Sequence, residues 1–242
     1  MTAPAAIHYF ERLASTMDLL HSLAAEGAAA GTVVRAAEQT GGRGSRGRIW
    51  LSPPGGLWLS VLLRPSSASA LDLLSLRIGL AVSQRLSDLV GGAPIRLKWP
   101  NDLMLGDRKA GGILCEARWQ GETLAWVAVG LGLNVANRVP DGLAEVATTL
   151  EDHAPGIVPD SLVEPVVATV LATETDSARL SERELERFEA LDWLLGRSLR
   201  SPVAGVAAGI ASDGALRVAL ADGRERAVRA GPVELAATPV RT

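Results

Sequence analysis

The apolar residues of this chain follow strand and helix spacing as far as Gly196, and this pattern limits the folds that the chain can adopt. Residues 57–63 form an almost unbroken apolar run with the length of a buried strand. Residues 74–89 carry apolar side chains at the spacing of a long amphipathic helix. The sequence therefore predicts one large domain of strands and helices over residues 1–195, with room for a small second domain.

The segment after Gly196 has a different character. Short alternating strands are separated by the turn sequences at 212–214 and 222–223, which are typical of hairpins. A segment of this size is too small to be stable alone. Residues 196–242 are therefore predicted to form a small open barrel that docks on the first domain.

The remaining segments give a coarse order of elements. Further strands are predicted at 7–10, 32–34, 95–99, 111–118 and 123–130. Helices are predicted from Ser15 or Thr16 to Gly27, over 160–176, and over 181–195 with a capping box at its start. Residues 39–48 are too rich in glycine and arginine to pack, so we expect a mobile loop unless a ligand orders it.

The composition excludes several classes of protein and site. The net charge of −3 argues against a general affinity for nucleic acid. The single cysteine, Cys115, permits no internal disulfide, so we expect a reducing compartment and apolar packing of this side chain. No apolar run approaches the roughly 20 residues that cross a bilayer, and the first residues lack a signal-peptide pattern. We therefore expect a soluble cytoplasmic protein with no membrane partner.

Lysine is rare in this chain, and its two occurrences lie close together. Of the 24 basic residues, 22 are arginines and only Lys98 and Lys109 are lysines. A compact ammonium group suits a point of concentrated negative charge better than a planar guanidinium does. Trp99-Pro100 forces an extended backbone, which places Asn101 and Asp102 in the turn after a strand. We expect a ligand at this turn, although a hairpin with exposed lysines has the same spacing.

Two other stretches are rich in glycine. In residues 39–48, glycines allow close backbone approach and the arginines supply charge for an anion, but the segment also fits a solvated loop or a nucleic-acid arm. Gly130 and Gly132 precede Asn134, a pattern that fits a nucleotide site or a bulge. The histidines have no metal-ligand spacing and are expected at the surface: His8, His21 and His153.

Taken together, these stretches resemble biotin protein ligases in order and spacing. The motifs that carry the resemblance are Glu38-Gln39-Thr40, Gly42-Arg43-Gly44 with Trp50, Lys98-Trp99-Pro100-Asn101-Asp102, Lys109-Ala110-Gly111-Gly112-Ile113 and Gly130-Leu131-Gly132-Leu133-Asn134. The resemblance implies an α+β fold, with a mixed sheet and flanking helices like those of class II aminoacyl-tRNA synthetases. It also implies that the carboxy-terminal segment is an SH3-like barrel. Some members carry an amino-terminal DNA-binding domain, which we expect to be absent here.

The resemblance implies an ATP-dependent ligase that works in two steps. Biotin and ATP give biotinyl-5′-AMP and pyrophosphate, and a lysine of a biotin carboxyl carrier protein then takes the biotinyl group. The carrier would belong to acetyl-CoA carboxylase or a related carboxylase. Mg²⁺ would be held through the ATP phosphates, nucleic acid would not be a partner, and the protein would be a monomer or a homodimer.

The resemblance also assigns roles to residues of this chain. The catalytic residues would be Lys109, Arg43, Lys98 and Asp102. The biotin-binding residues would be Ser15, Thr16, Gln39, Arg43, Gly44, Ser45, Lys109 and Gly112. The nucleotide-binding residues would be Arg46, Arg48, Trp50, Asn101, Gly132 and Asn134.

Two other functions fit parts of the same pattern. A lipoate or octanoate ligase of the same superfamily performs a similar acyl transfer. A non-enzymatic module could use the arginine-rich loop to bind RNA and the small barrel to bind a protein, although the two lysines would then be idle.

Two positions depart from the family pattern. Met17 follows Thr16 where the family usually has asparagine, and Ser45 stands where many bacterial members have a further arginine. A missing cation beside an anionic intermediate should weaken its retention. We predict that Ser45→Arg slows the escape of biotinyl-5′-AMP into solution, measured as release of the labelled intermediate. An unchanged escape rate would contradict this assignment of Ser45.

Overall fold

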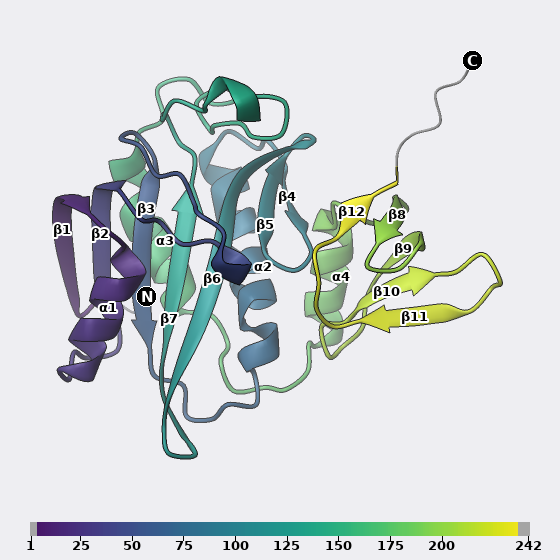
Figure 1. The fold of residues 1–242 in the computed structure, drawn as a ribbon, viewed down its shortest axis with the longest axis horizontal. Helices are drawn as coiled ribbons and strands as arrows, with labels where there is room; N and C mark the ends of the chain where they lie inside the picture. Colours follow the sequence, from purple (N-terminus) through teal and green to yellow (C-terminus); the bar gives the residue numbers. More distant parts are fainter. Residues whose placement is uncertain (1–3, 237–242) are drawn as a thin grey trace.

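A seven-stranded mixed sheet with helices on both faces stands beside a five-stranded antiparallel sheet (Figure 1). The computed structural model describes residues 4–236. The large sheet has the order β1-β2-β3-β7-β6-β5-β4, in which only β1 and β2 are parallel neighbours. Its strands are β1 (Ala6–Leu13), β2 (Thr32–Gln39), β3 (Leu57–Leu63), β4 (Ile95–Lys98), β5 (Asp102–Leu105), β6 (Arg108–Gln120) and β7 (Thr123–Leu133). The expected α+β fold with a mixed sheet is confirmed.

Helix ends follow the capping signals of the sequence. Ser15 accepts a hydrogen bond from the Asp18 backbone N–H at the start of α1, and Ser181 and Glu184 form the predicted capping box of α4. Gly27, with φ of 95°, follows the end of α1. The helices are α1 (Thr16–Ala25), α2 (Leu71–Leu89), α3 (Pro159–Leu171) and α4 (Glu182–Leu191), with short 3-10 turns η1 (Ser45–Gly47) and η2 (Asp141–Leu143).

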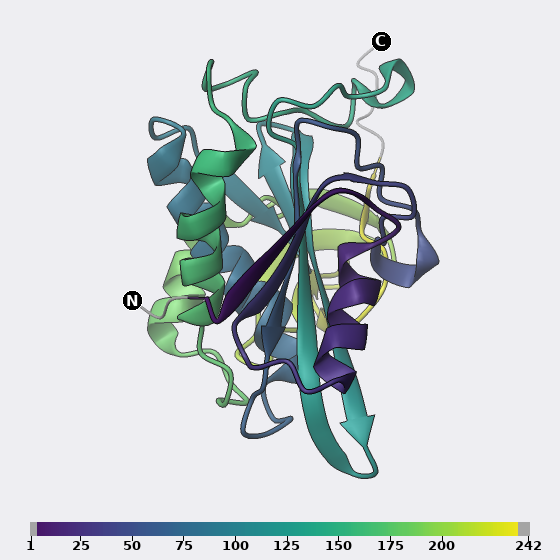
Figure 2. The ribbon, with the colours of Figure 1, turned by 90° about the vertical axis from the view of Figure 1, so that its left-hand side faces the viewer.

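Strand β3 lies between β2 and β7 in the interior of the large sheet and is buried on both faces. Leu57, Leu59 and Val61 project into the core that α2 and α3 cover. Leu62 projects to the opposite face and packs with α1. Figure 2 shows α1 and α3 on opposite sides of the sheet. A strand covered on both faces needs apolar side chains at successive positions, which explains the unbroken run in the sequence.

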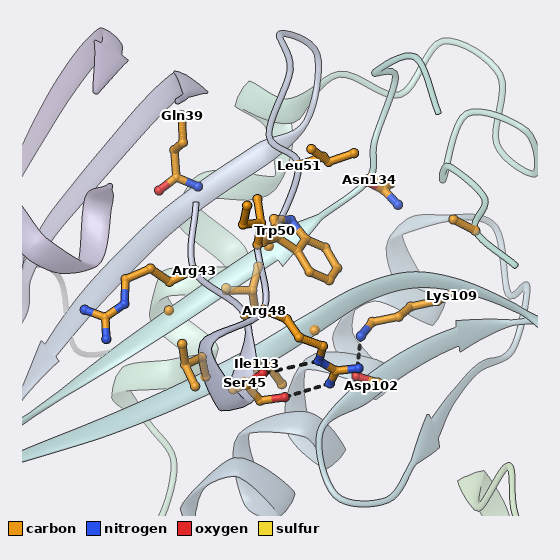
Figure 3. Close-up of a pocket in the computed structure, with 18 of the residues that line it drawn as sticks. Gln39, Arg43, Ser45, Arg48, Trp50, Leu51, Asp102, Lys109, Ile113 and Asn134 are labelled. Atoms are coloured by element: carbon orange, nitrogen blue, oxygen red, sulfur yellow. Dashed lines mark hydrogen bonds and ion pairs between the residues drawn. The ribbon is translucent and has the colours of Figure 1, made fainter. Parts of the chain in front are cut away.

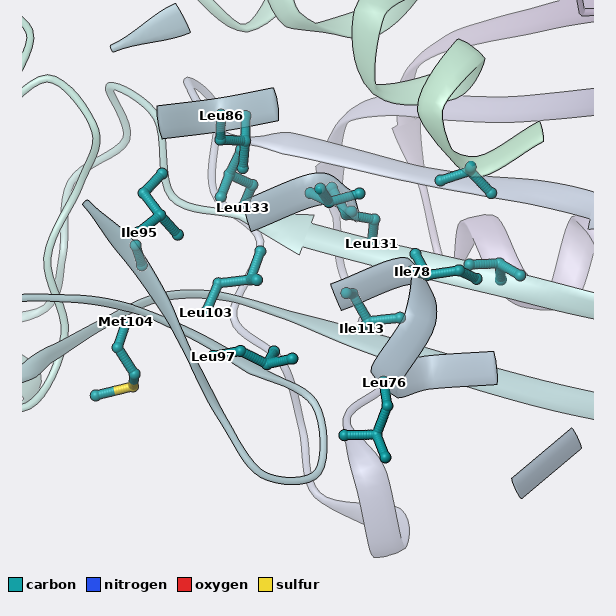
Figure 4. Packing of buried hydrophobic residues seen from close by; sticks show 14 of the residues in the cluster. Leu76, Ile78, Leu86, Ile95, Leu97, Leu103, Met104, Ile113, Leu131 and Leu133 are labelled. Atoms are coloured by element: carbon teal, nitrogen blue, oxygen red, sulfur yellow. The ribbon is translucent and has the colours of Figure 1, made fainter. Parts of the chain in front are cut away.

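Helix α2 supplies much of the main core (Figure 4). Its fully buried Ile78 and Leu86 face a set of leucine and isoleucine side chains from the sheet: Leu97, Leu103, Ile113, Leu131 and Leu133. Each such side chain contributes roughly 1.5–3 kcal/mol by leaving water. Gly79 lets α2 approach the sheet, because a Cβ there would lie 2.7 Å from a Leu97 methyl carbon. No helix within residues 4–236 is long and apolar enough to cross a membrane.

The small sheet has the order β11-β10-β9-β8-β12, with antiparallel neighbours throughout. Its buried side chains join the core of the large sheet, and Trp99 Nε1 donates to the Gly214 carbonyl at 2.9 Å. This docking agrees with the sequence-based expectation, while the boundary at 195/196 stays a prediction and residues 237–242 lie outside the described part. Its strands are β8 (Ser198–Ser201), β9 (Gly205–Ile210), β10 (Leu216–Ala219), β11 (Glu225–Val228) and β12 (Glu234–Leu235).

Several local predictions were wrong. Asp102 does not lie in a turn: it begins β5, a strand that the sequence did not indicate because its four residues are too few to show alternation. The last two helices end earlier than predicted, α3 at Leu171 and α4 at Leu191. His21 is not a surface residue, because its ring is hydrogen-bonded between α1 and the sheet.

Arg77 on α2 holds the segment between α3 and α4. Its side chain is only 2% exposed and donates to Glu184 Oε1 at 2.7 Å and to the carbonyls of Ser177 and Arg179 at 2.6 and 2.7 Å. We predict that Arg77→Ala lowers the free energy of unfolding by about 3 kcal/mol, because Glu184 loses its ion-pair partner and the Ser177 carbonyl loses its side-chain donor. Urea unfolding measures the change.

A matched control is Arg200→Ala, which removes an exposed ion pair with Glu234. This change should cost less than about 1 kcal/mol. Equal losses for the two variants would show that burial of Arg77 adds nothing.

Candidate active site

The register of the large sheet brings the lysine turn and two glycine stretches into one row. Paired residues on neighbouring strands project to the same face. In order across β4, β5, β6, β7 and β3, the paired residues are Lys98, Asp102, Gly112, Gly132 and Trp58. Two charged side chains therefore stand beside a strip of bare glycine backbone.

A pocket of about 330 Å³ lies over this strip (Figure 3). Trp50 rests on Gly132, where a Cβ would lie 2.6 Å from the indole Nε1. That Nε1 is buried and has no acceptor among the described residues. Only glycine at 132 allows the ring to lie on the backbone, with its N–H turned toward that backbone.

Polar groups line the opposite end of the pocket. Gln39 Oε1 accepts from the backbone N–H of Thr16 at 2.8 Å and from its hydroxyl at 3.0 Å. Gln39 Nε2 donates to Ser52 Oγ at 2.9 Å, which fixes the orientation of the amide. Met17 lies over Gly130, where a Cβ would be 2.8 Å from its sulfur. This end therefore combines fixed hydrogen-bonding groups with an apolar wall.

Lys109 and Asp102 form the charged side of the pocket (Figure 3). The Lys109 ammonium lies 2.5 Å from Asp102 Oδ1 and 5.0 Å from the centre of the Trp50 ring. Hydrogen bonds from Lys109 N to the Val146 carbonyl and from Thr148 N to the Lys109 carbonyl hold the backbone. Its ammonium is therefore fixed beside the open glycine strip.

Lys98 lines a second hollow of about 240 Å³ on the other side of Asp102. Its ammonium lies 5.3 Å from the centre of the Trp193 ring. Burial lowers the pKa of Lys98, Asp102 raises it, and the nearby cations, Lys109 first among them, lower it. A further anion in this hollow would offset the cost of gathering these positive charges.

Arg43 is not part of this cluster. Its guanidinium donates to Asp18 Oδ1 and to Glu116 Oε1, both at 2.6 Å, and points away from Lys109 (Figure 3). Arg48 donates to the hydroxyl of Ser45 at 2.9 Å. The expectation that Arg43 lies with the lysines does not fit this arrangement, because two carboxylates on other elements hold it.

The described residues contain little that could hold a metal ion. No group of three or more His, Cys, Asp or Glu side chains with suitable placement occurs within residues 4–236. Asp102 is the carboxylate that lines both hollows. One carboxylate fits a Mg²⁺ ion that takes its other ligands from phosphates and water.

Comparison with protein-family models shows to which family the chain belongs. Residues 9–134, just over half of the 242, match the model of the biotin/lipoate A/B protein ligase family. The chain belongs to this family. The matched range contains the whole row of paired residues described above.

Individual relatives match this ligase-family chain over only part of its length. The bifunctional ligase/repressor BirA of Bacillus subtilis is 37% identical over 151 residues, which cover 60% of this chain and 46% of that protein. The biotin–[acetyl-CoA-carboxylase] ligase of Paracoccus denitrificans is 40% identical over 118 residues, 48% of this chain and 49% of that protein. The chain thus spans about half the length of these curated relatives.

A solved structure extends the comparison to the whole fold. Biotin protein ligase from Aquifex aeolicus, in complex with biotin and ATP, covers 97% of this chain and 100% of its own, with a TM-score of 0.81 and 26% identity. The similarity therefore includes the small carboxy-terminal sheet as well as the large one.

The structure gathers most of the residues expected at a ligase site, but not all. Lys98 and Arg46 line the second hollow instead of the main pocket. Ser15 lines neither hollow, because its hydroxyl caps α1 by accepting from Asp18 N at 3.4 Å. The main pocket is lined by Thr16, Gln39, Arg43, Gly44, Ser45, Arg48, Trp50, Asn101, Asp102, Lys109, Gly112, Gly132 and Asn134.

Two residues near the site, Glu116 and Trp193, were not predicted from the sequence. Glu116 follows Gly112 at an even interval on the predicted strand 111–118, so alternation alone indicated that both face the pocket side. Trp193, which lies under Lys98, gave no local signal, because its contact joins segments far apart in the chain.

Asp192 lies behind the lysine turn of this ligase-family fold, where it pairs with Leu97. Burial raises the pKa of its carboxyl to about 6 from the ordinary 3.8, although Leu194 N donates to Oδ1 at 2.8 Å. Since the folded protein then holds this proton to higher pH than the unfolded chain does, the contribution of Asp192 to stability is fully present below about pH 4 and is lost as the pH rises through 6.

We predict that Asp192→Asn removes this part of the pH dependence. The variant should gain about 3 kcal/mol of stability over the parent between pH 4 and pH 7, because asparagine carries no buried charge. Urea unfolding of both proteins at a series of pH values measures the difference. A difference that does not change with pH would mean that Asp192 titrates normally.

Proposed function

We propose that this protein activates biotin with ATP as biotinyl-5′-AMP and then transfers the biotinyl group to a lysine of a carrier protein. The observation that carries the proposal is the row in which Lys98 and Asp102 stand beside the glycines of β6 and β7. The relatives that are named as biotin ligases support it, as does the Aquifex enzyme with biotin and ATP.

The polar end of the pocket suits the ureido ring of biotin. That ring presents N–H donors and a carbonyl acceptor, which need fixed partners when they leave water. Thr16 and Gln39 supply such groups, and Met17 supplies an apolar wall for the rest of the molecule. Ser15 would not contact the ureido ring, because its hydroxyl is used as a helix cap.

The charged side of the pocket suits the first chemical step. A carboxylate oxygen of biotin attacks the α-phosphorus of ATP, and pyrophosphate leaves. Two like unit charges 4 Å apart repel by about 4 kcal/mol at an effective dielectric constant of 20. Lys109, fixed beside the open strip, would bind both anions and offset this repulsion, while Lys98 and Arg46 would bind the departing phosphates in the second hollow.

Other residues would place the nucleotide and the acceptor. Trp50 would pack against adenine with Gly132 and Asn134 beneath it. Asp102 would orient Lys109 and accept a proton from the amine that attacks the biotinyl carbonyl, after which AMP leaves. Mg²⁺ would supply charge neutralisation to the phosphates, with Asp102 and Asn101 within reach of it.

We propose a biotin carboxyl carrier protein as the acceptor. The name of the Paracoccus relative, biotin–[acetyl-CoA-carboxylase] ligase, supports a carboxylase as its source. A cytoplasmic location, a monomer or homodimer, and the lack of a nucleic-acid partner remain part of the proposal.

The test is ATP–pyrophosphate exchange with different acids. Exchange that depends on biotin supports the proposal, and mass spectrometry should then find one biotinyl group on a carrier lysine. Exchange with lipoate or octanoate, but not with biotin, would assign the protein to the other branch of its family. Salt-sensitive RNA binding without any ATP turnover would indicate a binding module.

Lys109→Ala is the sharpest variant. We predict a fold like that of the parent and a loss of biotin-dependent exchange of about 100-fold or more, because the group that neutralises both anions is gone. Circular dichroism and the exchange assay measure the two properties.

Arg108→Ala is the matched control for Lys109→Ala. Arg108 is the neighbouring cation, and its side chain reaches the Ala144 carbonyl and neither hollow. It should keep nearly full exchange activity. Unchanged exchange in Lys109→Ala would remove the central assignment.

A further inference from the structure

Residues 40–50, here called the arginine loop, run along the edge of the pocket between β2 and Leu51. Within residues 4–236, its ion pairs to other elements all come from Arg43. Arg48 is bonded to Ser45 inside the loop itself. The attachment of the arginine loop by charge therefore depends on one side chain.

Arg43 joins two elements that lie on either side of it. One guanidinium nitrogen donates to Asp18 in the first turn of α1 and another to Glu116 on β6, both at 2.6 Å. A planar guanidinium can bind two carboxylates at once in a fixed geometry, which an ammonium does less well. The side chain of Glu116 is 17% exposed and that of Asp18 is 59% exposed, so Glu116 is the better shielded partner.

Glu116 is held by a chain of hydrogen bonds that runs from Trp126 through His21. The indole N–H of Trp126 donates to His21 Nδ1 at 3.0 Å, and His21 Nε2 lies 3.2 Å from Glu116 Oε2. Since an indole nitrogen can only donate, Nδ1 must be the acceptor and Nε2 must carry the proton that His21 donates to Glu116. Burial also lowers the pKa of His21, which favours this neutral form.

This chain of hydrogen bonds leaves the other carboxylate oxygen of Glu116 free for Arg43. Glu116 lies four residues along β6 from Gly112, about 13 Å at the rise of a strand, so it is outside the glycine strip. Neither Glu116, His21 nor Trp126 lines the pocket. Arg43 does line it, together with Thr16, Met17 and Gln39.

We propose that Glu116, oriented by His21 and Trp126 and assisted by Asp18, is a positioning residue that keeps the arginine loop closed over the Thr16–Gln39 end of the pocket. It acts through Arg43 and does not touch the substrate. It sets how long the acid and its adenylate stay bound. The part that concerns the adenylate rests on the proposed function.

The first test needs no substrate. Trypsin cleaves after Arg43, Arg46 and Arg48 when the arginine loop opens, so the rate of cleavage in the folded, ligand-free protein reports its closure. Glu116→Gln should raise this rate about ten-fold, the effect of losing one hydrogen bond to a charged group. A rate equal to that of the parent would overturn the proposal.

Two variants show whether the effect passes through Arg43. In an Arg43→Ala background, Glu116→Gln should add no further cleavage after Arg46 and Arg48, because the interaction is already absent. Additive effects would mean that Glu116 acts by another route and would overturn the proposal. Glu122→Gln is the matched control, because Glu122 is exposed on the β6–β7 hairpin and makes no ion pair with any described residue. Trypsin should cleave this variant at the same rate as the parent.

Asp18→Asn keeps the proposal testable if Glu116→Gln folds poorly. Asp18 is more exposed, so its loss disturbs the fold less, and it should give a smaller rise in cleavage of the same sign. No rise in this variant would count against the proposal.

The second test uses the chemistry. With biotin and ATP, Glu116→Gln should raise KM for biotin and the escape rate of the adenylate about ten-fold, with kcat for exchange within about two-fold, since Lys109 and Asp102 are untouched. A fall in kcat without a change in KM would overturn the positioning role.

The two tests separate the two proposals. Faster cleavage of Glu116→Gln in a protein that shows no biotin-dependent exchange would keep the role of Glu116 and remove the proposed function. Normal biotin-dependent exchange by the parent, together with unchanged cleavage of Glu116→Gln, would keep the proposed function and remove the role of Glu116.

Discussion

The strand register of the large sheet is the constraint on which the site depends. Pairing of β4 with β5, β5 with β6, and β6 with β7 sets Lys98, Asp102, Gly112 and Gly132 side by side. A shift of one residue in any of these pairs would turn the side chains of that strand to the opposite face. The charged groups would then enter the apolar core, which would cost several kcal/mol for each unpaired charge. The same burial that stabilises the fold therefore keeps the site in place.

The two faces of the sheet have different tasks. On one face α2 and α3 cover the strands with a continuous apolar core. On the other face α1 covers only part of the surface, through Leu20 and the side chains around it. The uncovered part is the glycine strip, where Trp50 lies on the backbone. A pocket forms there because two strands lack side chains at the positions where helices would otherwise pack.

Aromatic rings accompany both lysines of the chain. Lys109 lies over Trp50 and Lys98 over Trp193, one on each side of Asp102. The face of an aromatic ring attracts an ammonium group without adding a formal negative charge. A carboxylate partner, by contrast, offsets the positive charge of the ammonium group. Trp193 belongs to the segment that leads into the small sheet, and Trp99 donates a hydrogen bond to Gly214 in the turn between β9 and β10. The small sheet therefore supports the lysine turn as well as closing the core.

Local sequence patterns predicted the main helices and strands, a cap for α1 at Ser15 or Thr16 and the capping box of α4, and they drew attention to Lys98, Lys109 and the glycine stretches. These follow from local spacing and from the rarity of a residue type, which need no knowledge of distant contacts. Three features came from the tertiary structure: Asp102 begins a strand, Ser15 lines neither hollow, and Arg43 binds Asp18 and Glu116 instead of joining the lysines. The physical reason is that the partner of a charged or polar side chain is set by pairing between segments many residues apart, and local sequence carries no record of that pairing.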